Sequence, residues 1–188
     1  GYSLITHLYS AMSGVTRRKA YKYAGVIESA FLIDEMDVEI IADGVHLPPP
    51  LLKLVFKIKG PDRIALITDA MRAAGMPEGE SILGSRHNGL PVIVEDGVAK
   101  LPDRTSFAGS VATANRLLKT IVQIADVSII NAVKMLTTTP ARILNVSDRK
   151  GELVAGKDAD IVIFDDDFNI QTTIIKGKIV YDRVAMMQ

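Results

Sequence analysis

Three short apolar runs, each followed by a histidine or a carboxylate, constrain the fold of this chain most. They span residues 3–6, 38–42 and 63–68, and they lead to His7, His46 and Asp69. Short, almost wholly apolar runs are typical of parallel strands that are covered on both faces. In a (β/α)₈ barrel, the carboxyl ends of such strands carry the active site. We therefore predict an α/β fold in which these strands are the last three parallel strands of a TIM barrel, with their helices.

Helices are predicted between and after these strands. Apolar periodicity indicates helices over residues 20–36 and 51–58, and the second has prolines at its entrance. The stretch 13–19 is predicted to be a polar loop. Later helices are expected over residues 111–125, 129–137 and 140–145. Ser128 and Thr139 are the expected N-caps of the last two, because hydroxyl side chains favour that position.

The remaining strands are predicted to be antiparallel. Residues 92–95 and 98–101 flank Asp96-Gly97, a strong hairpin signal. After Gly151 the chain becomes rich in short apolar strands, at 161–164, 172–175 and 178–181. We therefore predict two domains: residues 1–145 as the C-terminal part of the barrel, with a β-hairpin insertion near 90–102, and residues 146–188 as part of a small β-sandwich domain.

Three parallel strands are too few to close a barrel, and they leave two strand edges without a partner. The chain also starts within the first predicted strand. We therefore expect the N-terminal half of the same protein as a partner of this segment.

Composition excludes several classes of protein. The formal net charge is zero and basic residues do not form a block, which argues against nucleic acid and anionic membranes as partners. No apolar run reaches the ~18 residues that a membrane-spanning helix needs. Cysteine is absent, so a metal would have to be held by histidine and carboxylate, and a reducing cytoplasm is the expected location.

Taken one at a time, the candidate residues leave alternatives open. His7 and His46 each fit a metal or substrate site, and each fits a histidine bonded to nearby backbone. Asp69 is harder to explain structurally, because a carboxylate buried at a strand end is costly unless it is paired or functional. Arg17 and Arg18 fit either a phosphate site or a solvated loop. His87, in a glycine-rich turn, is predicted to be a solvated loop residue.

Several motifs together resemble a known family. They are Thr-His-Leu-Tyr-Ser-Ala-Met at 6–12, Ile-Ala-Asp-Gly-Val-His at 41–46, Ile-Thr-Asp-Ala at 67–70, Thr-Pro-Ala-Arg at 139–142, Gly-Glu-Leu at 151–153 and Ala-Gly-Lys-Asp-Ala-Asp-Ile-Val at 155–162. In this order they resemble the N-acetylglucosamine-6-phosphate deacetylases of the amidohydrolase superfamily. The last three motifs are typical of the superfamily, and the first three point to the deacetylases.

The resemblance implies a role for each matched residue. His7 would be a ligand of a divalent metal, with zinc the first choice and iron, manganese or cobalt as alternatives. Asp69 would be the catalytic carboxylate, and His46 would bind the acetyl carbonyl. The remaining residues would contact a phosphosugar substrate. Ser10 and Ala11 would contact the sugar, and Arg18 would bind its phosphate from across a homodimer interface. Phe107 and Ala108 would line the acetyl or sugar side.

Two positions depart from the family pattern, in which asparagine is usual at Ser10 and glycine is common at Arg17. The family's other metal ligands, a glutamate and an earlier histidine, belong to strands upstream of Gly1. We therefore expect metal-dependent deacetylation of N-acetylglucosamine 6-phosphate from the parent enzyme, and no activity from this segment alone. The alternatives are another amidohydrolase, such as a cyclic amidase or a deaminase, and a non-catalytic sugar-phosphate-binding fragment.

Overall fold

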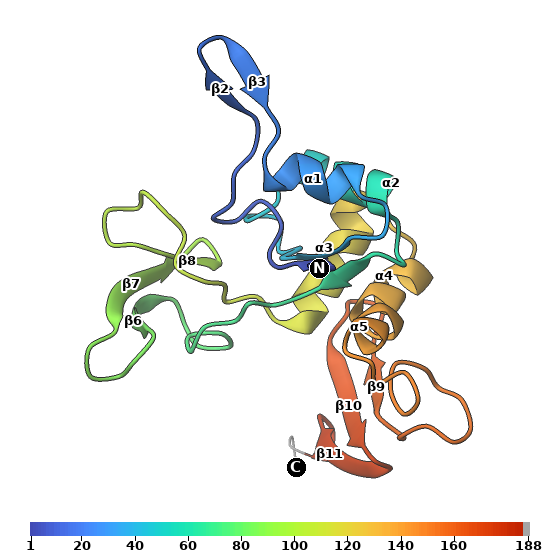
Figure 1. Cartoon of the computed structure of the whole chain (residues 1–188). Coiled ribbons are helices and arrows are strands. Elements are labelled where there is room, and N and C mark those ends of the chain that lie inside the picture. The colour runs from blue at the N-terminus through green and yellow to red at the C-terminus, as the bar shows by residue number, and fades with distance from the viewer. Residues whose placement is uncertain (186–188) are drawn as a thin grey trace.

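A three-stranded parallel sheet lies at the centre of the computed structural model (Figure 1), which describes residues 1–185. Its strands are β1 (Leu4–Ile5), β4 (Asp37–Ile40) and β5 (Ile64–Leu66), in the order β1-β4-β5. Leu4 pairs with Asp37, and Val38 pairs with Ile64. The three predicted parallel strands are confirmed, and their carboxyl ends lie at one edge of the sheet. Residues 186–188, the end of the predicted second domain, lie outside the described residues.

Five helices accompany the sheets in the described part of the chain. They are α1 (Val26–Leu32), α2 (Pro49–Lys59), α3 (Ala114–Ala125), α4 (Ile129–Leu136) and α5 (Thr138–Ile143). The main core joins Val38, Ile40 and Ile64 of the parallel sheet to buried side chains of the helices. Leu52 of α2 and Ile121 of α3 are among these side chains, and both are fully buried. No helix among the described residues is both long enough and apolar enough to span a membrane.

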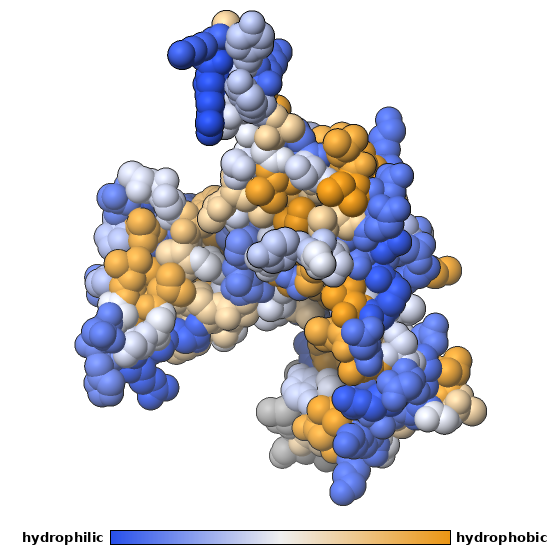
Figure 2. Space-filling model, in the orientation of Figure 1, coloured by the Kyte–Doolittle hydropathy of each residue, from blue (hydrophilic) through white to orange (hydrophobic). Residues whose placement is uncertain are grey.

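The predicted polar loop over 13–19 and the predicted start of the helix at residue 20 are both wrong. Residues 16–23 form a hairpin of β2 (Thr16–Arg18) and β3 (Tyr21–Tyr23), and the helix covers only Val26–Leu32. The turn between the strands has two residues with positive φ, Lys19 and Ala20, which is the geometry of a tight hairpin. Figure 1 shows the hairpin projecting from the body, and Figure 2 shows that its surface is mostly hydrophilic.

A second sheet forms a separate lobe beside the parallel sheet (Figure 1). It is antiparallel, with β6 (Gly79–Leu83), β7 (Leu90–Glu95) and β8 (Val98–Lys100) in that order. The Asp96-Gly97 hairpin is confirmed, since both residues have positive φ in the turn from β7 to β8. Strand β6 was not predicted, and it makes the predicted hairpin a three-stranded sheet. This sheet has its own small core, which includes Met71, Val92 and Ala108.

A third, antiparallel sheet follows the last helices. Its strands are β9 (Ile161–Phe164), β10 (Ile170–Ile175) and β11 (Lys178–Asp182), in the order β11-β10-β9. All three were predicted. Exposed apolar side chains on these strands include Val162, Ile163, Ile179 and Val180.

The starts of three helices can be compared with the predictions, which included N-caps for two of them. Ser128 is the N-cap of α4 and accepts a hydrogen bond from the Asn131 amide, as predicted. The predicted start of α5 at Pro140 is wrong: the helix begins at Thr138, and the Thr139 hydroxyl donates a 2.7 Å hydrogen bond to the Pro61 carbonyl oxygen. Helix α3 begins at Ala114 rather than 111. Ser110 forms an isolated parallel bridge with Ala70, and its hydroxyl accepts a hydrogen bond from the Ala112 amide, so the chain before Ala114 is not helical.

An ion network lies at the start of β4, at the end of the sheet opposite to the candidate site. Asp37 is 6% exposed and accepts two hydrogen bonds from the Arg142 guanidinium, at 3.0 and 2.7 Å. Arg63 donates a third, at 3.3 Å. Side-by-side bonds from a guanidinium satisfy both oxygens of a carboxylate, so this network ties α5 to the parallel sheet.

Candidate functional site

His46 is held by the carboxylate of Asp43, which was not among the predicted site residues. Its Nδ1 lies 2.8 Å from Oδ2 of Asp43, and both side chains are almost fully buried. The other carboxylate oxygen, Oδ1, accepts hydrogen bonds from the amides of Val45 and His46. A carboxylate is an acceptor, so Nδ1 carries the proton in this contact. The contact fixes the ring and leaves Nε2 available for a ligand.

The charge on Asp43 is stabilised by the same contacts. Burial by itself raises the pKa of this carboxyl, but the hydrogen bonds from the His46 ring and from the Val45 and His46 amides outweigh it and lower the pKa below its ordinary value. Asp43 therefore remains an anion under the imidazole. The signal was present in the sequence as an aspartate followed by a glycine and, three positions on, by a histidine, a spacing that allows a local side-chain turn.

His7 begins an irregular turn directly after β1. The amide of Leu8 donates to the Glu39 carbonyl oxygen at 2.8 Å, which continues the pairing with β4, and the amide of Ser10 donates to the His7 carbonyl oxygen at 2.9 Å. His7 Nδ1 is buried and has no hydrogen-bond partner among the described residues. Buried polar atoms are nearly always partnered, so this orphan nitrogen fits a metal ligand better than it fits a histidine bonded to nearby backbone.

Asp69 lies just beyond β5, and its backbone is fixed by Ser110. The Ser110 amide donates to the Asp69 carbonyl oxygen at 3.1 Å, and the Met71 amide donates to the Ser110 carbonyl oxygen at 2.8 Å. Asp69 has a φ of +45°, which is uncommon for aspartate. Its residue is exposed, which corrects the expectation of a buried carboxylate. Ser110 is fully buried, so a rigid segment holds an accessible carboxylate.

Phe107 and Ala108 reach the same edge from the second sheet. The Phe107 ring packs on the His46 ring, with centroids 4.9 Å apart and planes tilted by 50°. Ala108 is buried, and its amide donates to the Ala99 carbonyl oxygen at 2.9 Å. The structure therefore brings His46 and Phe107 together, as a shared site requires.

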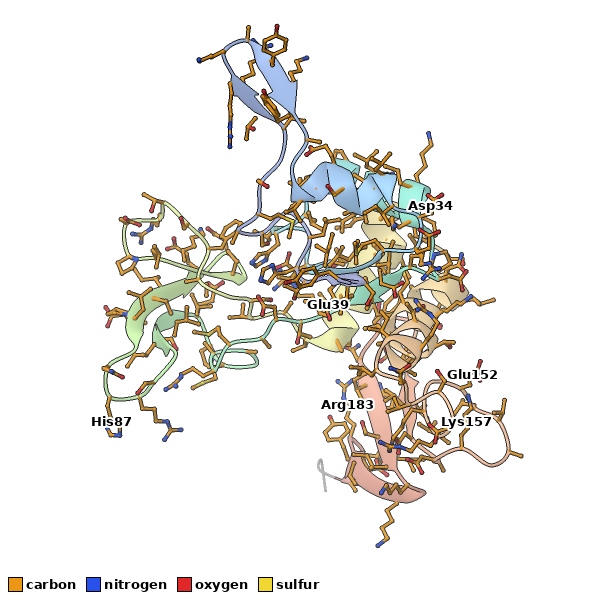
Figure 3. The ribbon with its side chains drawn as sticks, in the orientation of Figure 1. Asp34, Glu39, His87, Glu152, Lys157 and Arg183 are labelled. Atoms are coloured by element: carbon orange, nitrogen blue, oxygen red, sulfur yellow. The ribbon has the colours of Figure 1, made fainter. Side chains whose placement is uncertain are left out.

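Other predicted residues lie apart from these contacts. Arg18 is exposed on the β2–β3 hairpin, where its guanidinium carbon lies 5.8 Å from the centroid of the Tyr23 ring. Ser10 and Ala11 remain in the turn after His7, and Ala11 has a φ of +52°. His87 lies at the end of a loop of the β6–β8 sheet and points away from the body, whereas Glu39 lies on the central sheet (Figure 3). The prediction of a solvated loop for His87 is confirmed by its exposure.

The described residues do not form a complete metal site. Residues 1–185 contain no group of three or more histidine, aspartate or glutamate side chains that could hold a metal ion together. Catalytic zinc usually has three protein ligands. His7 fits one of them, and the others would have to come from residues outside this set.

Comparison with known proteins gives the same family. The model of the Amidohydrolase family matches residues 3–180. The N-acetylglucosamine-6-phosphate deacetylase of Bacillus subtilis (strain 168) is 37% identical over 181 residues, which are 96% of this chain and 43% of that protein. The N-acetylgalactosamine-6-phosphate deacetylase of Escherichia coli O157:H7 is 31% identical over 175 residues, 93% of this chain and 44% of that protein.

A solved structure agrees. The chain superposes with a TM-score of 0.84 and 32% identity on a mutant N-acetyl-D-glucosamine-6-phosphate deacetylase from Mycobacterium smegmatis in complex with N-acetyl-D-glucosamine-6-phosphate, covering 96% of this chain and 46% of that one. The chain thus spans less than half the length of each of these relatives. Because the family model covers most of the sequence, the chain belongs to the amidohydrolase family.

Proposed function

We propose that this chain supplies the catalytic carboxylate, the substrate histidine and one metal ligand of an N-acetylglucosamine-6-phosphate deacetylase. The reaction would hydrolyse the acetamide of the sugar to acetate and glucosamine 6-phosphate. The observation that carries the proposal is the arrangement at the carboxyl edge of the parallel sheet. There His7, the paired His46 and Asp69 follow three neighbouring parallel strands. The relatives named for this activity support it.

The same proposal assigns the domains. Residues 1–145 would contribute the last three strands of a (β/α)₈ barrel, and residues 146–188 part of a small β-sandwich. Two observations support this assignment: β1 and β5 are the outer strands of a sheet too small to close, and the β9–β11 sheet exposes apolar side chains. The proposed partner is the N-terminal half of the same protein, which would correspond to the part of the relatives that this chain does not match.

Asp69 and His46 divide the chemistry between them. Asp69 accepts a proton from the attacking water and then delivers it to the nitrogen of the departing amine. When the His46 ring is doubly protonated, Nδ1–H donates to Asp43 and Nε2–H donates to the amide oxygen as negative charge develops there. A divalent cation held by His7 and by residues outside the described set would supply Lewis acidity toward the water and the amide carbonyl.

The phosphate of the substrate would be bound by Arg18. Arg18 is exposed on the β2–β3 hairpin, which projects from the body of the molecule (Figure 1), so we propose that it reaches the site of a second copy in a homodimer. Ser10 stands where the family usually has asparagine, and its shorter side chain changes one polar contact to the sugar. The related N-acetylgalactosamine-6-phosphate deacetylase makes the C4 epimer the second candidate substrate. A reducing cytoplasm is the proposed location, in line with the absence of cysteine.

A chimera tests this function. In it, the chain replaces the matched part of the Bacillus subtilis deacetylase; this protein is called the chimeric deacetylase below. We expect metal-dependent release of acetate from N-acetylglucosamine 6-phosphate by the chimera and none from the chain alone. Ammonia release would favour a deaminase. A folded chimera that binds metal and the phosphosugar without releasing acetate would favour the non-catalytic sugar-phosphate-binding alternative.

A further inference from the structure

Arg116, in the first turn of α3, connects two segments that are far apart in the sequence. Its guanidinium donates a 2.7 Å hydrogen bond to the Gly97 carbonyl oxygen and a 3.2 Å hydrogen bond to the Asp43 carbonyl oxygen. Gly97 forms the turn between β7 and β8, and Asp43 is the residue that holds the His46 ring. Among the described residues, Arg116 forms no ion pair, so its hydrogen bonds go to these two carbonyl groups.

The turn at Gly97, which Arg116 contacts, is also held by a second residue. Gly97 has a φ of +69°, and its amide donates a 2.9 Å hydrogen bond to a carboxylate oxygen of Glu78. A Cβ atom at Gly97 would lie 3.1 Å from the Arg116 guanidinium, so the two residues are in close contact. The turn is therefore held by Glu78, just before β6, and by Arg116 of α3.

The second sheet meets His46 at another point, through Phe107. Phe107 forms an antiparallel bridge with Lys100 at the end of β8, so its backbone follows the position of this sheet. Its ring packs on the His46 ring at 4.9 Å. Displacement of the sheet would therefore separate the two rings, and displacement of Asp43 would turn the imidazole.

The geometry points to Arg116 as a positioning residue that holds the β6–β8 sheet and the end of β4 in one register, so that Phe107 stays packed on His46. A planar guanidinium suits this role because it presents several N–H donors in a rigid fork, which two carbonyl oxygens on different segments can share. The relevance of this register to catalysis rests on the proposed deacetylase function, in which His46 binds the amide oxygen. The register itself can be tested without assuming that function.

Histidine NMR on the full chain tests the proposal. The sequence has 3 histidines, so the ring signals of His7, His46 and His87 can be followed separately. Phe107→Leu removes the ring current on His46 and gives the reference position of its signals. In Arg116→Met, we expect the His46 signals to move most of the way to that reference, with His7 and His87 unchanged.

Two further variants complete the test. Lys119→Met removes a positive charge from an exposed position of the same helix and should leave all three histidines unchanged. Arg116→Lys keeps the charge but reaches only one carbonyl group, so its His46 signals should lie between those of the wild type and Arg116→Met. This milder variant decides the matter if Arg116→Met fails to fold.

The proposal is overturned if His46 keeps its wild-type signals in the Arg116 variants, or if all three histidines shift alike. The first result would mean that the rings stay together without Arg116, and the second that the arginine only stabilises the whole chain. Because these spectra need neither metal nor substrate, an inactive chimeric deacetylase would reject the proposed function and leave this inference standing. In an active chimera, Arg116→Met should lower kcat while KM changes little.

Discussion

The Ser110 amide donates a 3.1 Å hydrogen bond to the carbonyl oxygen of Asp69 and thereby fixes the residue proposed as the catalytic carboxylate. The returning bond from the Met71 amide to the Ser110 carbonyl oxygen makes a short parallel bridge beyond β5. This bridge stabilises a backbone conformation at Asp69 that aspartate adopts infrequently. The position of Asp69 in the candidate site therefore depends on the segment around Ser110, which precedes α3.

Gly109→Ala should disturb this bridge. Gly109 has a φ of +80°, and a Cβ atom there would lie 3.3 Å from Cβ of Met71. We expect a loss of about 1–3 kcal/mol in the free energy of unfolding, measured by urea denaturation. The control is Gly75→Ala, with a φ of +77° and no atom within 4 Å of the added Cβ. Equal losses in the two variants would show that backbone strain acts alone.

Asp69→Asn should abolish most of the chemistry with little effect on binding. Asparagine keeps the shape of the side chain but cannot accept and return a proton. We expect kcat of the chimeric deacetylase to fall by about 10²–10⁴-fold, with KM nearly unchanged, in an assay of acetate release. Turnover close to that of the parent chimera would reject the assigned role of Asp69.

Asp43→Asn should destabilise the fold in a pH-dependent way. The folded-state pKa of Asp43 is lowered, so the unfolded chain binds more protons at acidic pH. The contribution is fully present above the ordinary aspartate pKa of about 3.9 and is lost as the pH falls through the lower folded value. At pH 7 we expect Asp43→Asn to cost about 1–3 kcal/mol.

The measurement for Asp43 is urea unfolding of the wild type and the variant between neutral and acidic pH. The difference between them should shrink as the pH drops below about 4. Asp148→Asn, at an exposed position, is the matched control and should show no such trend. A difference that is constant over the whole range would contradict the assigned charge of Asp43.

Metal content should depend on His7 and on residues outside the described set. After dialysis, we expect the isolated chain to retain much less than one equivalent of zinc, because one histidine is a weak site. The chimeric deacetylase should retain stoichiometric metal, and His7→Ala should lower that content by elemental analysis. His87→Ala, which removes an exposed histidine, should have no effect.

Arg142→Met should lower stability without touching the site. The substitution leaves the nearly buried Asp37 with only the longer bond from Arg63. Because Arg142 itself is partly exposed, we expect a cost of about 1–3 kcal/mol and a lower melting temperature by calorimetry. Arg149→Met removes an exposed arginine that contacts Asp158 at 3.4 Å, and its melting temperature should change little.

The sequence was most informative where local pattern and tertiary structure agree. The apolar runs before His7 and Asp69 became parallel strands because both faces of the sheet need apolar cover. The Asp96-Gly97 turn has the positive φ values that its residue types favour. Ser128 caps α4 through a bond to a nearby amide, which a short-range pattern can predict.

The predictions failed where distant contacts decide. Residues 20–23 were included in a predicted helix, but Tyr21–Tyr23 pair with Thr16–Arg18 as a hairpin. Thr139 fits an N-cap, but its hydroxyl bonds to Pro61, far away in the sequence. The role of Ser110 depends on a contact with Asp69, and that of Arg116 on Gly97, and no local pattern predicts either. In the candidate site, the sequence therefore indicated the groups that are proposed to react and missed most of the residues that hold them.

The two ends of strand β4 lie next to residues with different roles. At its start, Asp37 is anchored by arginines, and just beyond its end, Asp43 orients the imidazole of His46. An alteration near His46 can retune reactivity while the arginine anchor continues to secure the architecture. Redesign of the candidate site should therefore be confined to positions at the carboxyl edge other than the proposed reacting groups and Asp43, and should leave the opposite edge intact.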